Sequence, residues 1–256
     1  AARENWNIIA MLNNDMIGNS GSSETLLNDN MRVRVFSEGV PAYETEQMAS
    51  LRKYTSGEND SRARQLARYI KEVGERYVDQ LSVTLIFRSD RFGRSGDHTP
   101  FSQKGFPAVR ICEFNENYDR THKVPGVVNG VKQGDLPEYV DYEYVRKNTG
   151  INLASIASLA LAPYEPVNCG MVISGLTNTT TLRWEEPAKG VRPAGYYILI
   201  RETWQPLWEK KIFVRATEVT LPYSKDNYFF AVQSVDAGGH ESIPVFPGRA
   251  ARQTGR

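Results

Sequence analysis

The sequence predicts an α/β part, built on a mixed and mostly parallel sheet flanked by helices, followed by an all-β sandwich. Up to about residue 163, nearly continuous apolar runs alternate with a helical period, which is typical of strands covered on both faces. From residue 164 the helical period disappears, and short alternating runs follow with Pro, Gly and Asp-Asn turns between them. We therefore expect domains at 1–163 and 164–247, and a frayed tail at 248–256.

Three apolar runs in the first part read as buried strands. They are "NIIAMLNNDM" at 7–16, "LSVTLIFR" at 81–88 and "FPAVRICEF" at 106–114. Two further stretches have the period of a helix. Residues 59–78 begin with potential capping residues and then place Leu66, Ile70, Val73 and Tyr77 on one face. Residues 137–163 read as a helical stretch that ends at Pro163, with an expected interruption near Gly150.

The second part reads as five short strands. They are predicted at 179–187, 195–203, 210–216, 217–223 and 227–239. The segments "LRWEEP", "AGYYILIRE" and "LPYSKDNYFFAVQSVDAGGHES" resemble a fibronectin type III module, which implies an immunoglobulin-like sandwich. In that resemblance Trp184 is a core residue and Tyr228 takes the tyrosine-corner position. Modules of this kind usually bind or space other domains, so we expect Glu185 and Glu186 to be a solvated pair and His240 to lie in a surface loop.

Composition excludes several classes of partner. The 31 basic and 30 acidic side chains leave a net charge of +1, which argues against a broad surface for nucleic acid or anionic membranes. No run of eighteen apolar residues is present to span a bilayer. Cys112 and Cys169 are too few for a disulfide framework or a thiolate zinc site, and the sequence leaves open whether they are bridged.

Carboxylate and imidazole groups follow the predicted strands of the first part. Asp15 ends the first strand, Asp97 and His98 lie in the loop after the second, and Glu113 ends the third and leads on to His122. In an open α/β sheet ligands bind at the carboxyl ends of strands, and zinc accepts these groups. Each residue also has a structural alternative: Asp15 as a turn cap, His122 as an exposed loop residue, and Asp97 as a brace for the glycine-rich loop.

The segments "MLNNDMIGN", "SGDHTPFSQKGFPAVRICE" and "YDRTHK" resemble the second half of the di-zinc aminopeptidase family, which includes bacterial leucyl aminopeptidases and glutaminyl cyclases. The resemblance covers residues 5–162. It implies that Asp15 and His122 ligate different zinc ions of a two-zinc site. It also implies that Asp97, His98 and Phe101 form the substrate-binding wall beside the metals, and it makes Tyr118 a weak candidate for the oxyanion donor.

Part of the family pattern does not occur in this sequence. The family needs an upstream His-x-Asp, whose Asp bridges the metals, and a Glu-Glu pair that supplies the general base and a ligand; only fourteen residues precede Asp15. A catalytic zinc needs about three protein ligands. We therefore expect an incomplete chain that is inactive alone and is a fragment of a full enzyme. The alternative is that the missing N-terminal half of the catalytic domain is a separate polypeptide that pairs with it as a partner.

The resemblance implies a zinc-dependent aminopeptidase in the complete protein. There, zinc-bound water would attack the first peptide carbonyl of a peptide substrate, and the absent Glu would move the proton. Two alternatives stay open: a non-catalytic peptide- or surface-binding protein on a degenerate peptidase scaffold, and a glutaminyl cyclase-like enzyme. By association with exported bacterial proteins, the expected location is the periplasm or the cell exterior.

Overall fold

The computed structural model describes residues 1–250, so the last six residues of the predicted tail lie outside the described residues. The chain forms two compact units, one from residues 1–43 and 66–155 and the other from 44–65 and 156 onward. Each unit draws on two separate stretches of chain. The boundary predicted at residue 163 is a single cut in the chain and so differs from this division; it stays a prediction.

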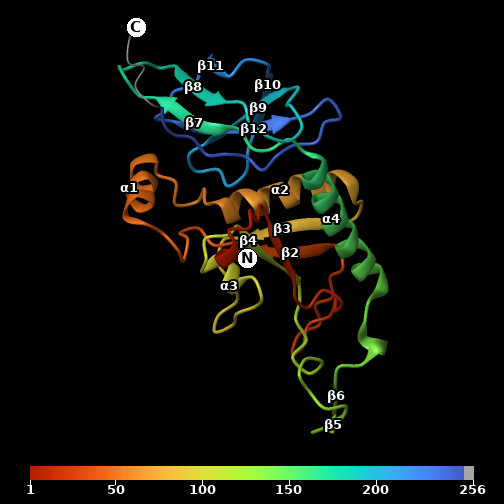
Figure 1. Cartoon of the computed structure of the whole chain (residues 1–256). Helices are drawn as coiled ribbons and strands as arrows, with labels where there is room; N and C mark the ends of the chain where they lie inside the picture. Colours follow the sequence, from red (N-terminus) through yellow and green to blue (C-terminus); the bar gives the residue numbers. More distant parts are fainter. Residues whose placement is uncertain (251–256) are drawn as a thin grey trace. The chain divides into compact units, whose positions relative to one another are not determined.

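A four-stranded mixed sheet organises the first unit (Figure 1). Its strands are β1 (Met11–Asn14), β2 (Arg32–Phe36), β3 (Ser82–Ile86) and β4 (Ala108–Glu113), in the spatial order β1-β4-β2-β3. β1 pairs with β4 in parallel, β2 pairs with β3 in parallel, and β2 pairs with β4 antiparallel. The predicted strands 7–16, 81–88 and 106–114 correspond to β1, β3 and β4, whereas β2 was not predicted.

The two faces of this sheet differ in chemistry because side chains alternate along a strand. On β4, Val109 and Ile111 are fully buried apolar residues on one face, while Arg110 and Cys112 are equally buried on the other. A charged residue inside a central strand must find a counter-charge, since burial removes its water. The face that carries Arg110 is therefore where polar structure is expected to concentrate.

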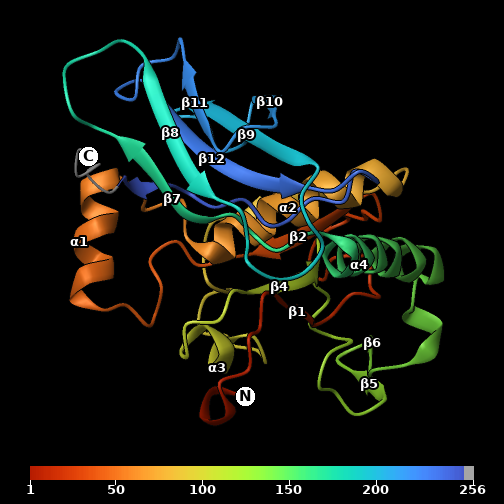
Figure 2. The same ribbon diagram turned by 45° about the horizontal axis from the view of Figure 1, so that its top comes forward.

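Two helices that lie mostly in the first unit pack on one another. α2 (Arg62–Tyr77) starts with Ser61, whose hydroxyl accepts from the backbone N–H of Arg64 at 3.1 Å. α4 (Tyr142–Leu161) is preceded by a 3-10 turn, η2 (Pro137–Tyr139). A Cβ on Gly74 of α2 would come within 3.1 Å of the Ile151 side chain of α4, so glycine permits this close approach. Figures 1 and 2 show the short helix α3 (Thr99–Ser102) on the side of the sheet away from α2.

The interruption predicted near Gly150 does not occur, because α4 continues through this residue without a break. A Cβ at Gly150 would lie 2.9 Å from Cγ2 of Val78. Gly150 therefore allows close packing against Val78 and does not break the helix. This packing compensates for the low helix propensity of glycine. The first unit also contains a 3-10 turn, η1 (Ala2–Glu4), and a hairpin of β5 (Gly126–Val128) and β6 (Val131–Gln133).

Two sheets of the second unit share one core. One sheet has the order β10-β9-β12 and the other β11-β8-β7-β13. Their strands are β7 (Val167–Val172), β8 (Thr180–Glu185), β9 (Gly195–Glu202), β10 (Lys210–Val214), β11 (Glu218–Leu221), β12 (Tyr228–Val235) and β13 (Gly248–Arg249). The buried cluster draws Leu182 and Trp184 from β8, Ile198 from β9 and Phe230 from β12. The five predicted strands match β8 to β12, and the core position predicted for Trp184 is confirmed.

The second unit also contains the short strand β13 and the helix α1. The first residues of the predicted tail, 248 and 249, form β13 and pair with β7, so they are not frayed. α1 (Glu46–Thr55), which was not predicted, belongs to this unit. Glu185 and Glu186 are exposed, as expected for a solvated pair. Cys112 and Cys169 are both free. Among the described residues, no helix is long and apolar enough to cross a membrane.

Candidate functional site

The strand ends of the first unit do not all meet at one edge. β1 and β4 run in parallel and end together, as shown by the hydrogen bond from the Asp15 N–H to the Ile111 carbonyl at 3.0 Å. β3 runs antiparallel to β4 because β2 reverses the direction between them. The expectation that three strand ends gather at one edge was therefore wrong for β3. The loop that follows β3 nevertheless reaches β1, because Nδ1 of His98 lies 3.4 Å from Nδ2 of Asn13.

Asp15 lies at the shared end of β1 and β4. Its Oδ2 forms an ion pair with Nη2 of Arg110 at 2.9 Å, and its side chain remains 36% exposed. Arg110 is fully buried and also donates from Nη1 to the two carboxylate oxygens of Asp90, at 3.1 and 3.2 Å. Asp15 is thus a partly exposed carboxylate held by a buried cation, which is more than a turn cap.

His98 is buried beside β1, the strand that ends just before Asp15. Its side chain is 5% exposed. Its Nε2 lies 3.0 Å from the Ser89 carbonyl oxygen, and its Nδ1 lies 3.4 Å from Nδ2 of Asn13. With both ring nitrogens engaged, His98 braces the loop against β1.

The other predicted wall residues differ in exposure. Asp97 is exposed, and Phe101 on α3 is half-buried with its ring 6.2 Å from that of Phe106. Gly96 connects this loop to the carboxylate: a Cβ built there would lie 2.8 Å from Nδ2 of Asn13 and 3.3 Å from Oδ2 of Asp15. The loop backbone therefore passes directly beside Asp15. The assignment of Asp97, His98 and Phe101 as substrate-binding residues stays a prediction.

His122 lies in an exposed loop and has a left-handed backbone, with φ of 56°. This conformation is uncommon for a residue other than glycine, and it points to a turn fixed by its surroundings. The preceding Thr121 hydroxyl donates to the Asn117 carbonyl at 3.2 Å and helps to hold that turn. Tyr118 is 49% exposed, and the Arg94 guanidinium lies 6.0 Å from the centroid of its ring. Both His122 and Tyr118 remain available to a ligand.

A second group of charges is buried beside the site. Glu116 binds Nη2 of Arg34 at 2.6 Å and is also hydrogen-bonded by Arg91. Burial opposes ionisation of Glu116, but the hydrogen bonds from Arg34 and Arg91 outweigh it and lower its pKa. Arg91 lies 3.6 Å from Asp90, so the Arg110 pairs and the Glu116 pairs form one connected network. The loops at this edge of the sheet are therefore tied together by charge.

Glu113 ends β4 and holds the loop that follows Asp15. Its carboxylate accepts from the backbone N–H of Asn19 at 2.9 Å, and the residue is 2% exposed. Burial raises the pKa of Glu113 to about 7; the Asn19 N–H opposes this rise, and the negative charge of Glu116 adds to it. Glu113 therefore titrates near neutrality in the folded protein, although nothing in the sequence alone indicated this.

The residues present fit a zinc site only in part. Within residues 1–250, no three His, Cys, Asp or Glu side chains gather as a metal-binding group. Asp15 offers one partly free carboxylate and His122 one exposed imidazole, which is less than the three protein ligands of a catalytic zinc. The described residues do not form a complete zinc centre by themselves, and Asp15 and His122 stay predicted ligands.

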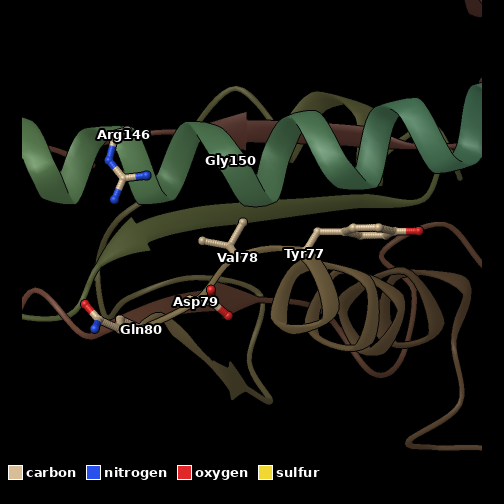
Figure 3. A pocket seen from close by; sticks show the side chains of 6 residues that line it. All are labelled: Tyr77, Val78, Asp79, Gln80, Arg146 and Gly150. Atoms are coloured by element: carbon tan, nitrogen blue, oxygen red, sulfur yellow. The ribbon is translucent and has the colours of Figure 1, made fainter.

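A small cavity of about 330 Å³ lies elsewhere in the first unit. Figure 3 shows Arg146 and Gly150 on α4 facing Val78, Asp79 and Gln80 just after α2. None of the predicted site residues lines it. Arg146 is already paired with Glu143 at 2.8 Å, and both side chains are largely exposed. This cavity is therefore an open polar hollow separate from the candidate site.

The polar residues that organise the candidate site were missed at the level of sequence. They are Asn13, Arg34, Asp90, Arg91, Arg110 and Glu116. One signal was available: Arg110 stands inside the apolar run "PAVRICEF", and a charge in a central strand requires a buried partner. Another was "RVRVF", whose alternation marks β2. The identity of the partners could not be read locally.

The chain is similar to fungal proteins named as probable zinc metalloproteases. One from Leptosphaeria maculans is 41% identical over 242 residues, which are 94% of this chain and 56% of that protein. One from Phaeosphaeria nodorum is 38% identical over 247 residues, and covers 94% of this chain and 49% of that protein. One from Pyricularia oryzae is 39% identical over 248 residues, with the same two shares. The chain thus spans about half the length of these relatives.

Solved structures resemble only part of the chain. Titin module A71 from human cardiac muscle covers 35% of it at 24% identity, with a TM-score of 0.28. The fn3 domain of human collagen alpha-1(XX) covers 37% at 22% identity, with a TM-score of 0.29. No protein-family model matches the chain.

Proposed function

We propose that this chain is part of a zinc metallopeptidase, and that the complete protein is an aminopeptidase acting on the N-terminal bond of peptides. The observation that carries the proposal is the 41% identity, over 94% of the chain, with a protein named as a probable zinc metalloprotease. The aminopeptidase specificity rests on the motifs around Asp15, Asp97 and His122, which resemble the di-zinc family.

The geometry supports a metal ligand at Asp15. Its carboxylate ends a strand at the edge where β1 and β4 finish together, and it is 36% exposed although Arg110 holds one of its oxygens. A carboxylate that is oriented by a second group and open on its other side is what a metal ligand needs. In this proposal the ligands beyond Asp15 and His122 lie outside the described residues, and two zinc ions bind in the complete enzyme.

The proposed substrate is a peptide with a free amino terminus. Asp97, His98 and Phe101 are proposed to border its binding site, and Tyr118 is the weak candidate for the oxyanion donor. The general base is not assigned to a residue of this chain. The predicted periplasmic or extracellular location stays a prediction, and the relatives named above are fungal proteins.

Zinc titration of the 256-residue chain by calorimetry tests the proposal. The wild-type chain would be compared with Asp15→Ala, His122→Ala and the control His240→Ala, alongside hydrolysis of aminoacyl p-nitroanilides. His240 is a suitable control because its Nδ1 lies 2.9 Å from Oδ2 of Asp236, in the second unit. We expect the Asp15 and His122 variants to weaken zinc binding and the His240 variant to leave it unchanged.

The outcomes separate the alternatives. Two tightly bound ions with measurable hydrolysis would extend the enzyme assignment to this chain alone. Zinc that stays bound in Asp15→Ala and His122→Ala, or is lost in His240→Ala, would refute the ligand assignment. If the wild-type chain binds no zinc, the same variants should be made in a longer protein that supplies the remaining ligands. Absence of zinc binding in that protein would favour a non-catalytic binding protein on a peptidase scaffold.

A further inference from the structure

One buried arginine connects the end of β1 to the loop before α3. Arg110 stands in β4, the strand that lies between β1 and β2, and its side chain is 0% exposed. A guanidinium keeps its proton at any ordinary pH, so it cannot escape the cost of burial by becoming neutral. Its place in the sheet therefore depends on the groups that meet its charge.

Those groups come from two different segments. The Nη1 of Arg110 donates to both oxygens of Asp90, at 3.1 and 3.2 Å, and to the Ser95 carbonyl at 3.3 Å. The Nη2 lies 2.9 Å from Oδ2 of Asp15. The Asp90 side chain is 6% exposed, whereas that of Asp15 is 36% exposed. Nη1 thus contacts the buried Asp90 of a loop that is otherwise mostly exposed, and Nη2 contacts the Asp15 carboxylate, which still faces outward.

Strand register explains why this arrangement is possible. Arg110 is directly opposite Asn13 in the parallel pair of β1 and β4, and Asp15 follows two residues later. Side chains two residues apart point to the same face of a strand, so Asp15 emerges on the face that Arg110 occupies. Nη1 donates hydrogen bonds to Asp90, whereas Nη2 meets Asp15 as an ion pair without the geometry of a hydrogen bond, so one guanidinium offsets the charge of both carboxylates.

The loop held by Asp90 is the same loop that lies beside Asp15. His98 ties it to β1 through Asn13 at 3.4 Å, and Gly96 lies so close that a Cβ there would be 3.3 Å from Oδ2 of Asp15. The loop therefore passes directly beside the Asp15 carboxylate at Gly96, and it is held there both by His98 and by the Arg110 contacts to Asp90 and Ser95.

We propose that Arg110 is a positioning residue, which holds one oxygen of Asp15 and, through Asp90, sets the 89–98 loop against it. The coupling between Asp15 and the 89–98 loop involves only residues that the structure describes. The role of the loop and the carboxylate in binding a peptide at a metal rests on the proposed function. Arg110 would not touch the substrate or the reacting atoms.

Hydrogen–deuterium exchange of the 256-residue chain tests this coupling without any metal or substrate. In Arg110→Met, amides at 89–98 and 13–18 should exchange roughly tenfold faster, while amides in β2 and β3 change much less. The matched control is Arg201→Met in the second unit, where another buried arginine, 1% exposed, pairs with a buried aspartate at 2.6 Å. That control should leave exchange at 89–98 unchanged.

A second variant guards against loss of folding in Arg110→Met. Asp90 also approaches His98 and Arg91, at 3.6 Å each, and these residues reach Asn13 and Met16. Asp90→Asn is therefore made both in the wild-type chain and in Arg110→Met. If the arginine carries the link, Asp90→Asn should accelerate exchange at 13–18 in the wild-type chain and add nothing in Arg110→Met. Uniform acceleration over the whole first unit, or no change at 13–18 in Asp90→Asn, would overturn the proposal and leave Arg110 as a core residue.

Zinc binding is a second measurement, and it reports separately on the proposed function. If the wild-type chain takes up zinc, Arg110→Met should weaken its binding by roughly 10- to 100-fold, the usual effect of losing a group that orients a ligand. Arg201→Met should not change it. Altered exchange with no zinc binding in any variant would support the coupling, and the metal assignment would then be decided in a protein that supplies the remaining ligands. Zinc binding that is unaffected by Arg110→Met would count against the positioning role.

Discussion

Asp60 and Arg201 form a fully buried ion pair although 141 residues separate them in sequence. The Oδ2–Nη2 distance is 2.6 Å, and the two side chains are 0% and 1% exposed. Arg201 also donates from Nη1 to the Gln205 carbonyl at 2.6 Å, and Gln65 donates to the other oxygen of Asp60 at 3.0 Å. The pair joins the segment 44–65 to the strands of the second unit, to which both residues belong.

Breaking this pair on one side should cost more than removing both charges. Arg201→Met alone should lower the free energy of unfolding by about 3–5 kcal/mol, because it leaves the Asp60 carboxylate buried without its cation. The double variant Asp60→Asn, Arg201→Met should be more stable than Arg201→Met. Urea unfolding of the four members of this cycle measures the coupling. Purely additive costs would show that the two residues do not depend on each other.

Trp184 should be a major contributor to the stability of the second unit. Its side chain is 4% exposed, and its ring meets that of Tyr196 edge-on at 5.3 Å. Trp184→Ala should cost about 3–5 kcal/mol, the usual range for truncating a large core side chain. Trp204 offers a matched control because it is 72% exposed, so Trp204→Ala should stay within about 0.5 kcal/mol of wild type. Equal losses in both variants would contradict the core assignment.

Gly150→Ala should destabilise the first unit even though alanine is the better helix former. The new Cβ would lie 2.9 Å from Cγ2 of Val78, and overpacking of this kind costs about 1–3 kcal/mol, against a gain in helix propensity of about 1 kcal/mol. In a Val78→Ala background the clash disappears, so the same change should become neutral or stabilising. Thermal melts of the four proteins measure both effects, and stabilisation by Gly150→Ala alone would contradict the packing explanation.

Glu113 should make stability depend on pH around neutrality. Its pKa is about 7 in the folded protein against 4.5 for an ordinary glutamate side chain, so the folded state binds the proton more tightly than the unfolded state. The resulting stabilisation is complete below pH 4.5 and is lost as the pH rises to about 7. A shift of this size corresponds to about 3 kcal/mol.

Glu113→Gln should remove that dependence because the amide cannot ionise, while its oxygen can still accept from the Asn19 N–H. Urea unfolding between about pH 5 and pH 8 should therefore show a flatter profile for the variant, and greater stability than wild type at the upper end. Glu46→Gln, at an exposed position of α1, should keep the wild-type profile. An unchanged slope in Glu113→Gln would assign the titration to another group.

Local pattern was sufficient for much of the chain. The run "LSVTLIFR" predicted β3, and the spacing of Leu66, Ile70, Val73 and Tyr77 predicted one apolar face of α2. The first three residues are at most 1% exposed, whereas Tyr77, at the end of the helix, is 62% exposed. The resemblance of "LRWEEP" to a fibronectin type III module placed Trp184 in a core, where the structure has it. Such predictions succeed because burial on one face imposes a period that each segment displays by itself.

β2 and α1 escaped prediction for different reasons. In "RVRVF" the two arginines break the apolar run, although Val33 and Val35 alternate with them and are fully buried. α1 exposes most of its residues and buries none fully, so its sequence shows no strong apolar face. Gly150 was misread because a glycine weakens a helix in isolation, whereas here it allows close contact with Val78.

By itself the sequence determined the positions of β1, β3 and β4, the buried face of α2, the core position of Trp184, and the chemistry offered by Asp15 and His122. The burial that it predicted for all three strands holds only for β4, because β1 and β3 are edge strands. The tertiary structure alone decided that β4 inserts between β1 and β2, that β3 ends at the opposite edge, and that Arg110 joins Asp15 to Asp90. It also brought Asp60 to Arg201. The physical reason is that periodic burial is written into each segment, whereas a buried charge is stable only beside partners that strand order and register bring from distant parts of the chain.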